Sequence, residues 1–444
     1  MNNKIPHQIN QRFIDFDTGK LRLLFFALLI GLIVGLGCAF FRIVLNYIEV
    51  YRNTLYENAG TSGFMSGLLA VLFAASGISI SLFLVRKFAP EASGSGVHEI
   101  EGALDGIRPM RWKRVLPIKF IASLFSLGSG LLLGREGPTI QMGANIGKML
   151  KDLLGLSDDE NNALVSAGAA AGLASAFNAP FAGIIFVIEE MRGHFKFNFY
   201  SVAAIMVGAG AADFVVRVLI GSEPVIQMMV FSDVNISGMW LFILLGLLFS
   251  IVGYFYNKLL ILSLGLFKFS QKIPVIIIGI FVGIIIVSIG VFYPEMIGGG
   301  YDTIKEVLSQ SFALYFLLIL FAVRMLLSIF SYTIGVSGGL FIPMLTLGVL
   351  LGMFFGIIMQ QYFPNLISHP GVFAIAGMAG IFASTVRAPL TGLVLAVEMT
   401  SNFELILPLI VTTVTASVFT ALLGNQPIYS SLLKRVLANA EFEK

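Results

Sequence analysis

Charged residues are scarce in this chain. Only 12% of its 444 residues are Asp, Glu, Lys or Arg, whereas 57% are hydrophobic and the mean hydropathy is +0.91. Soluble domains carry about 25% charged residues, so this composition excludes an ordinary soluble protein. The basic residues are scattered between apolar stretches and the net charge is only +3, which argues against nucleic acid as a partner.

Cysteine is almost absent too. The single cysteine, Cys38, lies within the first apolar stretch. One cysteine allows neither an intrachain disulfide nor a thiolate metal cluster, so we interpret it as a small apolar side chain. The glycine-rich strings lack the lysine of a nucleotide-binding loop. We therefore expect no cofactor, no metal and no enzyme activity.

Long apolar runs dominate the sequence instead. Four of them contain no charged residue and have the length of a helix that crosses about 30 Å of hydrocarbon, namely residues 23–41, 64–85, 236–256 and 275–293. A longer charge-free run, residues 325–386, is cut by prolines and must form several helices. The chain is thus predicted to be an all-α polytopic membrane protein whose first helix is retained and is not a signal peptide.

Basic residues flank the apolar region at both ends. Four of them precede the first apolar run, and Lys434 and Arg435 follow the last one. The positive-inside rule places both termini in the cytoplasm, so the number of crossings should be even. We expect a polar cytoplasmic segment over residues 1–20, a cytoplasmic C-terminal helix over 425–444, and no soluble regulatory domain.

The two halves of the sequence repeat each other. Five residues recur 209 positions later, because Ser175, Ala179, Pro180, Gly183 and Glu189 match Ser384, Ala388, Pro389, Gly392 and Glu398. Three more recur 205 positions later, because Gly134, Pro138 and Gly143 match Gly339, Pro343 and Gly348. Membrane repeats often have inverted topology and meet near the midplane through broken helices. We predict repeats over residues 21–220 and 236–424, a linker over 221–235, and contact between the Gly134 and Gly339 segments.

Three glycine-rich breaks interrupt the apolar sequence. They are Gly94-Ser95-Gly96-Val97-His98, Gly134-Arg135-Glu136-Gly137-Pro138 and Gly339-Leu340-Phe341-Ile342-Pro343. Glycine lets backbone amides turn inward, and proline suits the first turn of a following helix. A helix N-terminus presents unpaired N–H groups and about half a positive charge, which suits a dehydrated anion. The breaks therefore indicate an anion pathway.

These segments resemble those of the CLC family of chloride channels and chloride/proton antiporters. The family forms GSGIP, GREGP and GxFxP correspond to residues 94–98, 134–138 and 339–343 in the same order, and the family tyrosine before the last helix corresponds to Tyr429. The bacterial antiporters are the most similar branch, because both of their glutamates have counterparts here. The resemblance implies two inverted repeats of tilted and broken transmembrane helices, a homodimer with one pathway in each subunit, and a place in the bacterial inner membrane.

The resemblance also implies a chloride site. In the family, a central anion is held by the serine of the first segment, the terminal tyrosine hydroxyl and two backbone amides of the third segment, which correspond to Ser95, Tyr429, Leu340 and Phe341. Neutral donors replace water around chloride without trapping it as a lysine would. Taken alone, the serine would be interpreted as a helix N-cap and the tyrosine as an interfacial aromatic.

Two glutamates carry the expected proton chemistry. A carboxylate among apolar residues costs about 2.5–3.5 kcal/mol, so Glu136 needs a partner or a function. Its charged head can occupy an anion site and can leave once protonated, which makes it the outer gate and proton carrier; the alternative is a surface ion pair with Arg135. By resemblance, Glu190 is the inner proton acceptor, although a helix end entering water would look the same. Glu189 repeats as Glu398, which favours a structural role for that residue.

Chloride/proton exchange has three alternatives. A passive chloride channel would favour an uncharged residue in place of Glu190. A fluoride/proton exchanger would lack the pattern of Ser95 and Tyr429. An intramembrane hydrolase would use Ser95 with His98, but serine at position 93 breaks the G-x-S-x-G pattern.

His98 stands where the family usually has proline. It is either a titrating group near the site or a surface-facing histidine in the first turn of a short helix. The expected partners are chloride, protons and the lipid bilayer, and nitrate or bromide would fit the same donors.

Overall fold

The computed structural model describes residues 18–61, 63–191, 193, 198–231, 236–267, 272–310 and 312–442. Within these ranges the regular secondary structure is helical, and strand-like pairing is limited to two isolated β-bridges. The polar segment expected over residues 1–20 lies almost wholly outside the described residues, and its cytoplasmic position stays a prediction.

The described residues of the first half form eight α-helices. These are α1 (Thr18–Thr61), α2 (Phe64–Phe88), α3 (Val97–Leu104), α4 (Trp112–Gly128), α5 (Glu136–Leu154), α6 (Asp158–Phe177), α7 (Pro180–Glu190) and α8 (Phe199–Leu219). Three of them begin at or just after the glycine-rich or proline-bearing breaks that the sequence shows.

The second half forms nine α-helices. These are α9 (Met239–Leu266), α10 (Val275–Phe292), α11 (Tyr301–Ser309), α12 (Leu314–Thr333), α13 (Phe341–Tyr362), α14 (Gly371–Thr385), α15 (Pro389–Thr400), α16 (Ile406–Leu422) and α17 (Ile428–Phe442). The charge-free run 325–386 divides into parts of α12, α13 and α14, which confirms that it forms several helices.

Eight helices of the described residues are long and apolar enough to cross a membrane: α1, α2, α8, α9, α10, α12, α13 and α16. The four charge-free runs of the sequence that have the length of one membrane helix all coincide with helices of this set. Large apolar side chains also cover its outer faces, and Phe40, Phe255 and Phe281 are all more than half exposed. Such a surface is stable against lipid and not against water, so the chain is an integral membrane protein.

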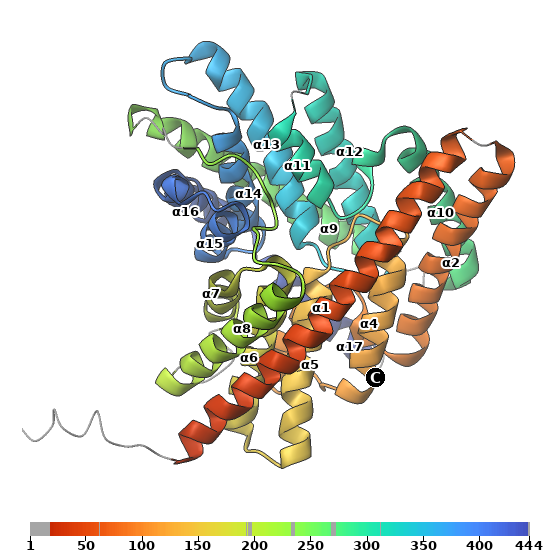
Figure 1. The fold of residues 1–444 in the computed structure, drawn as a ribbon, viewed down its shortest axis with the longest axis vertical. Coiled ribbons are helices and arrows are strands. Elements are labelled where there is room, and N and C mark those ends of the chain that lie inside the picture. Colours follow the sequence, from red (N-terminus) through yellow and green to blue (C-terminus); the bar gives the residue numbers. More distant parts are fainter. Residues whose placement is uncertain are drawn as a thin grey trace, which may run out of the picture.

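Helix α1 runs diagonally across the molecule, with α2 and α10 beside its C-terminal half (Figure 1). Its 44 residues would extend about 66 Å, more than twice the hydrocarbon thickness, so the helix must tilt or protrude. It packs closely on α8 because Gly31 and Gly35 have no side chain: an added Cβ would lie 2.4 Å from the Gly208 oxygen and 2.8 Å from the Ala212 oxygen. This is the small-residue packing typical of membrane helices.

The sequence repeat is visible in the packing of equivalent helices. An added Cβ on Gly143 of α5 would lie 2.0 Å from the Gly168 oxygen of α6, and one on Gly348 of α13 would lie 2.4 Å from the Gly377 oxygen of α14. The four glycines correspond pairwise under the offsets of 205 and 209 residues. The exact boundaries of the two repeats stay a prediction.

Helices α7 and α15 cap each other. The Glu398 carboxylate accepts the N–H groups of Phe181 (3.2 Å) and Ala182 (2.7 Å) in the first turn of α7. Glu189 accepts those of Leu390 (3.1 Å) and Thr391 (2.8 Å) in the first turn of α15. Each carboxylate thus satisfies amides that a helix start leaves without intrahelical acceptors, which confirms the structural role expected for Glu189.

Candidate functional site

The three glycine-rich breaks meet in the interior. Gly134 and Gly339 form an antiparallel bridge in which each amide donates to the other carbonyl, at 2.8 and 2.6 Å. Gly94 donates to the Val336 oxygen at 2.8 Å, and its own oxygen accepts from Gly338 at 3.0 Å. The predicted contact between the Gly134 and Gly339 segments is therefore confirmed, and α5 and α13 both begin at this point.

Glycine is required where these segments touch. Gly94 and Gly96 have φ angles of 59° and 80°, in the region that side chains disfavour. A Cβ on Gly96 would lie 2.2 Å from the Gln141 side chain, and one on Gly137 would lie 2.7 Å from the Ser95 Cα. The backbone of the first segment can lie against α5 only because these positions have no side chain.

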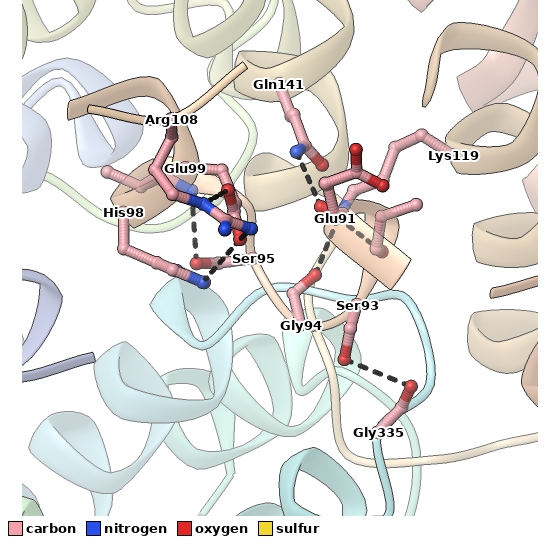
Figure 2. Close-up of polar contacts among 12 residues, drawn as sticks. Glu91, Ser93, Gly94, Ser95, His98, Glu99, Arg108, Lys119, Gln141 and Gly335 are labelled. Carbon is pink, nitrogen blue, oxygen red and sulfur yellow. Dashed lines mark hydrogen bonds and ion pairs between the residues drawn. The ribbon is translucent and has the colours of Figure 1, made fainter. Parts of the chain in front are cut away.

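Buried polar side chains hold the first segment in place (Figure 2). Lys119 of α4 donates to the carbonyl oxygens of Ala92 (3.1 Å) and Gly94 (2.6 Å), and Ser93 Oγ donates to the Gly335 oxygen at 3.1 Å. The Lys119 side chain is fully buried. The sequence interpretation missed this residue, although an isolated lysine in an apolar helix marks a functional or structural contact.

Ser95 and Tyr429 both lie buried near the start of α13. The Val97 amide donates to Ser95 Oγ at 3.4 Å, but the N-cap residue of α3 is Gly96, so the interpretation of Ser95 as the helix N-cap is wrong. The Tyr429 hydroxyl is buried and has no hydrogen-bond partner among the described residues. Its ring lies 6.1 Å from the Phe341 ring. An unpartnered buried hydroxyl is costly unless a ligand satisfies it.

Leu340 and Phe341 stand at the N-terminus of α13. Leu340 is the N-cap residue and Phe341 is the first residue of the helix, so their amides have no intrahelical acceptor. Tyr332, which the sequence interpretation did not single out, lies beside this region, and its hydroxyl accepts the Ser95 amide at 3.4 Å. Neutral donors from four separate elements thus gather where the breaks meet.

Glu136 is completely buried as the first residue of α5. Its Oε1 accepts a hydrogen bond from the Tyr301 hydroxyl at 2.7 Å, while Oε2 has no partner among the described residues. The side chain folds back over the backbone break, because a Cβ on Gly134 would lie 2.0 Å from Oε2. The carboxylate therefore sits beside the bridge of Gly134 and Gly339.

The alternative of a surface ion pair between Glu136 and Arg135 is wrong. Glu136 has no exposed surface, and Arg135 donates to the Ala176 oxygen at 3.2 Å. The Arg135 guanidinium also lies over the Tyr301 ring, 4.3 Å from its centroid. Arg135 and Tyr301 both line a cavity of about 880 Å³.

Glu190 is the last residue of α7, and its carboxyl group lies close enough to that of Glu101 for the two to interact. Glu101 belongs to α3, the short helix that follows Ser95, and it is buried. Two carboxyl groups can share a hydrogen bond only when one of them carries a proton. The pair is thus able to hold a proton in α3, the helix that begins just after Ser95.

His98 is buried, so the interpretation as a surface-facing histidine is wrong. Its Nε2 lies 3.9 Å from Glu99 Oε1, and Glu99 is itself held by two hydrogen bonds from Arg108, at 2.9 and 3.0 Å (Figure 2). Within the described part of the chain, no hydrogen bond joins His98 to Ser95. The nucleophile and base of the hydrolase alternative are therefore not assembled.

Comparisons with known proteins agree on one family. Residues 76–421 match the family described as voltage gated chloride channel. The chain is 43% identical to the H(+)/Cl(-) exchange transporter ClcA of Vibrio cholerae serotype O1 (strain M66-2), over 99% of this chain and 95% of the relative. It is 40% identical to the protein of the same name from Salmonella schwarzengrund (strain CVM19633), over 98% of this chain and 93% of the relative.

A solved structure is similar over the same extent. The crystal structure of a slow cyanobacterial Cl⁻/H⁺ antiporter superposes with a TM-score of 0.90 at 36% identity, covering 94% of this chain and 98% of that one. The arrangement of broken helices in the two proteins is therefore the same, as the motifs predict. The chain belongs to the voltage-gated chloride channel family, the CLC family.

Proposed function

We propose that this protein exchanges chloride for protons across the membrane. The observation that carries the proposal is a buried carboxylate, Glu136, with one unpartnered oxygen at the point where the α5 and α13 breaks meet. Similarity to two proteins named H(+)/Cl(-) exchange transporter and to a Cl⁻/H⁺ antiporter supports it. A carboxyl group in that place links the two ions, because its protonation changes the charge of the anion pathway.

Chloride would be held by neutral donors. Ser95 and Tyr429 supply hydroxyl groups, and Leu340 and Phe341 supply amides from the positive end of α13. These groups replace the hydration shell of the ion while leaving it able to move on. Lys119 stabilises the backbone of the segment that contains Ser95. It does not bind the ion, because its ammonium group donates to two backbone carbonyls.

Glu136 would act as gate and as proton carrier. When ionised, its carboxylate competes with chloride for the positive potential of the helix N-termini and closes the pathway. When protonated, the neutral side chain is released and an anion can take its place. One proton is then carried inward as chloride moves outward, so the two fluxes are coupled.

Glu190 would pass protons to and from the cytoplasm. Its neighbour Glu101 provides a second carboxyl group on the way toward Ser95. This route would be separate from the chloride path, because neither glutamate supplies a donor to the anion. A passive channel of the same fold would not need such a pair, which is why we favour exchange.

The location and assembly follow from the resemblance. We place the protein in the bacterial inner membrane with both termini in the cytoplasm, as a homodimer whose subunits each contain a complete pathway. The short helices α7 and α15 span only about 17 Å each, and they expose Phe181 and Leu390 by 64% and 59%. Cross-linking of the purified protein in lipid should give a dimer, and a persistent monomer would contradict this part of the proposal.

The proposed function is tested by following both ions at once. Purified protein is placed in liposomes with a chloride gradient, and the voltage is clamped with potassium and an ionophore. Chloride efflux accompanied by proton uptake is expected. Chloride flux without proton movement would favour the passive channel, and fluoride flux without chloride flux would favour the fluoride exchanger.

Tyr429→Ala is expected to weaken chloride binding by about tenfold, because it removes a buried donor worth about 1–3 kcal/mol to a charged partner. Titration calorimetry with chloride measures the change. Tyr362→Ala is the control, because Tyr362 is 72% exposed. Equal chloride affinity in Tyr429→Ala and wild type would contradict the placement of the anion site.

His98→Pro is expected to change the transport rate or its pH dependence by a small factor, while the fold remains intact. Proline is tolerated in the first turn of a helix, where His98 lies, so α3 should form. The change removes a buried titratable group 3.9 Å from Glu99. Proton-coupled chloride flux measured from acid to neutral pH would show the effect, and superimposable curves would assign His98 a packing role only.

A further inference from the structure

Tyr301 contacts the proposed gate directly. It is the first residue of α11, and its hydroxyl donates to Glu136 Oε1 at 2.7 Å although the two residues are 165 positions apart. Its ring is partly buried, with the Arg135 guanidinium 4.3 Å from its centroid and the Phe177 ring at 6.5 Å. Tyr301 also lines the cavity of about 880 Å³.

The backbone before Tyr301 is fixed by an unusual set of contacts. Arg324 of α12 is buried and donates to the carbonyl oxygens of Glu295 (2.6 Å), Ile297 (3.1 Å) and Gly298 (2.9 Å). The Gly298 amide donates to the Gly130 oxygen at 2.8 Å. Because the turn into α11 is held on two sides, the Tyr301 ring has little freedom to leave its place.

The arginines near the gate are occupied with other partners. Arg135 of α5 faces both Glu136 and Tyr301, Arg42 of α1 faces Tyr301, and Glu49 of α1 faces Glu136. Glu49 in turn faces Arg52 of α1 and Asp302 of α11. Arg42 donates to the Ser175 oxygen (2.8 Å) and to Asn178 (2.6 Å). Arg52 donates to Asn53 and to the Leu127 oxygen.

Arg135 donates to the carbonyl oxygen of Ala176. Among the described residues, no ion pair reaches the Glu136 carboxylate. In this part of the structure, the Tyr301 hydroxyl is thus the side-chain group that donates a hydrogen bond to the Glu136 carboxylate.

We propose that Tyr301 is a positioning residue that holds the ionised Glu136 side chain in the closed position and thereby sets the pH at which the pathway opens. This inference rests on the proposed role of Glu136 as the gate. A phenol donates more strongly to a carboxylate than to a carboxylic acid, so the contact favours the ionised, closed form. Among the described residues Oε2 has no side-chain donor, although the backbone amides of Glu136 and Ile342 lie near the carboxylate, and it is the oxygen on which an arriving proton would bind.

Tyr301→Phe should move the half-maximal pH of chloride transport upward by about one unit. The change removes the hydroxyl and keeps the ring under Arg135. Without this donor the ionised gate is less stable, so it takes up a proton, and opens, at a lower proton concentration. A hydrogen bond to a charged group changes an equilibrium about tenfold or more, which corresponds to about one pH unit. Chloride efflux from liposomes at a series of pH values measures the shift.

Two controls separate this role from a general structural one. Tyr315→Phe removes a hydroxyl from a residue that is 71% exposed and should leave the pH curve in place. Tyr301→Phe combined with Glu136→Gln should behave as Glu136→Gln alone, because the carboxylate on which Tyr301 acts is gone. A shift in the single variant that disappears in the double variant is the expected result.

Three results would count against the proposal in different ways. If wild type exchanges chloride for protons and Tyr301→Phe has the wild-type pH curve or one displaced to lower pH, the role of Tyr301 is contradicted and the proposed function stands. A shift of equal size in both backgrounds would also contradict it, since Tyr301 would then act through another group. If wild type moves no protons with chloride, the proposed function itself fails, and the role of Tyr301 fails with it.

Discussion

Glu136→Gln should continue to move chloride while losing both proton transport and the dependence of chloride flux on pH. Glutamine has nearly the shape of the protonated acid and cannot carry a charge into the site between α5 and α13. The gate would then resemble its open state at every pH, and no side chain would be left to carry the proton. Proton flux should fall to the level of protein-free liposomes.

This result is checked by recording chloride and proton fluxes between about pH 4 and pH 8, a range that spans carboxyl titration. Glu404→Gln is the matched control, because Glu404 is exposed and lies in the short turn before α16. Chloride flux that still rises as the pH falls, with the wild-type slope, would show that another group is the gate. Size-exclusion chromatography in detergent would establish that the variant is folded.

Glu190→Gln should also abolish proton transport, but it should leave chloride binding close to wild type. No donor to the anion is removed, since Glu190 lies at the end of α7 and its partner is Glu101. Proton flux is expected to fall by at least about tenfold, because an amide cannot take up and release the transported proton. Calorimetry with chloride and flux measurements on the same preparation separate the two effects.

The neighbouring residue provides the control for this variant. Glu189→Gln changes the same functional group one position earlier, but Glu189 accepts the amides at the start of α15 and a glutamine oxygen can still accept. Proton coupling should therefore survive in Glu189→Gln and not in Glu190→Gln. Loss of coupling in both variants would mean that the end of α7, and not Glu190 itself, is required.

The sequence was sufficient for the features that depend on local pattern. The charge-free runs predicted the membrane helices, and the two offsets predicted that the Gly134 and Gly339 breaks would meet, as they do through a pair of backbone hydrogen bonds. Glycine and proline leave a clear local signal because they limit or free the backbone at their own position. The structural role of Glu189 was predicted from its match with Glu398 in the repeat.

Contacts between distant segments could not be predicted in this way. The hydrogen bond of Tyr301 to Glu136 joins residues 165 positions apart, and nothing near Tyr301 in the sequence marks it as more than an aromatic at a helix start. The burial of His98 depends on how α3 packs and not on its own neighbours. Lys119 did leave a signal, a cation within an apolar helix, but its contact with Gly94 required the fold.

The most direct test of chloride/proton exchange is uphill proton pumping by the wild-type protein. Liposomes containing the protein are loaded with high chloride and diluted into low chloride at equal pH on both sides, with the membrane potential held at zero by potassium and an ionophore. Chloride leaving the liposomes should drive protons inward against the pH gradient that builds up, and a proton ionophore should dissipate that gradient. If chloride leaves and the pH outside does not change, the two ions are not coupled and the account is contradicted.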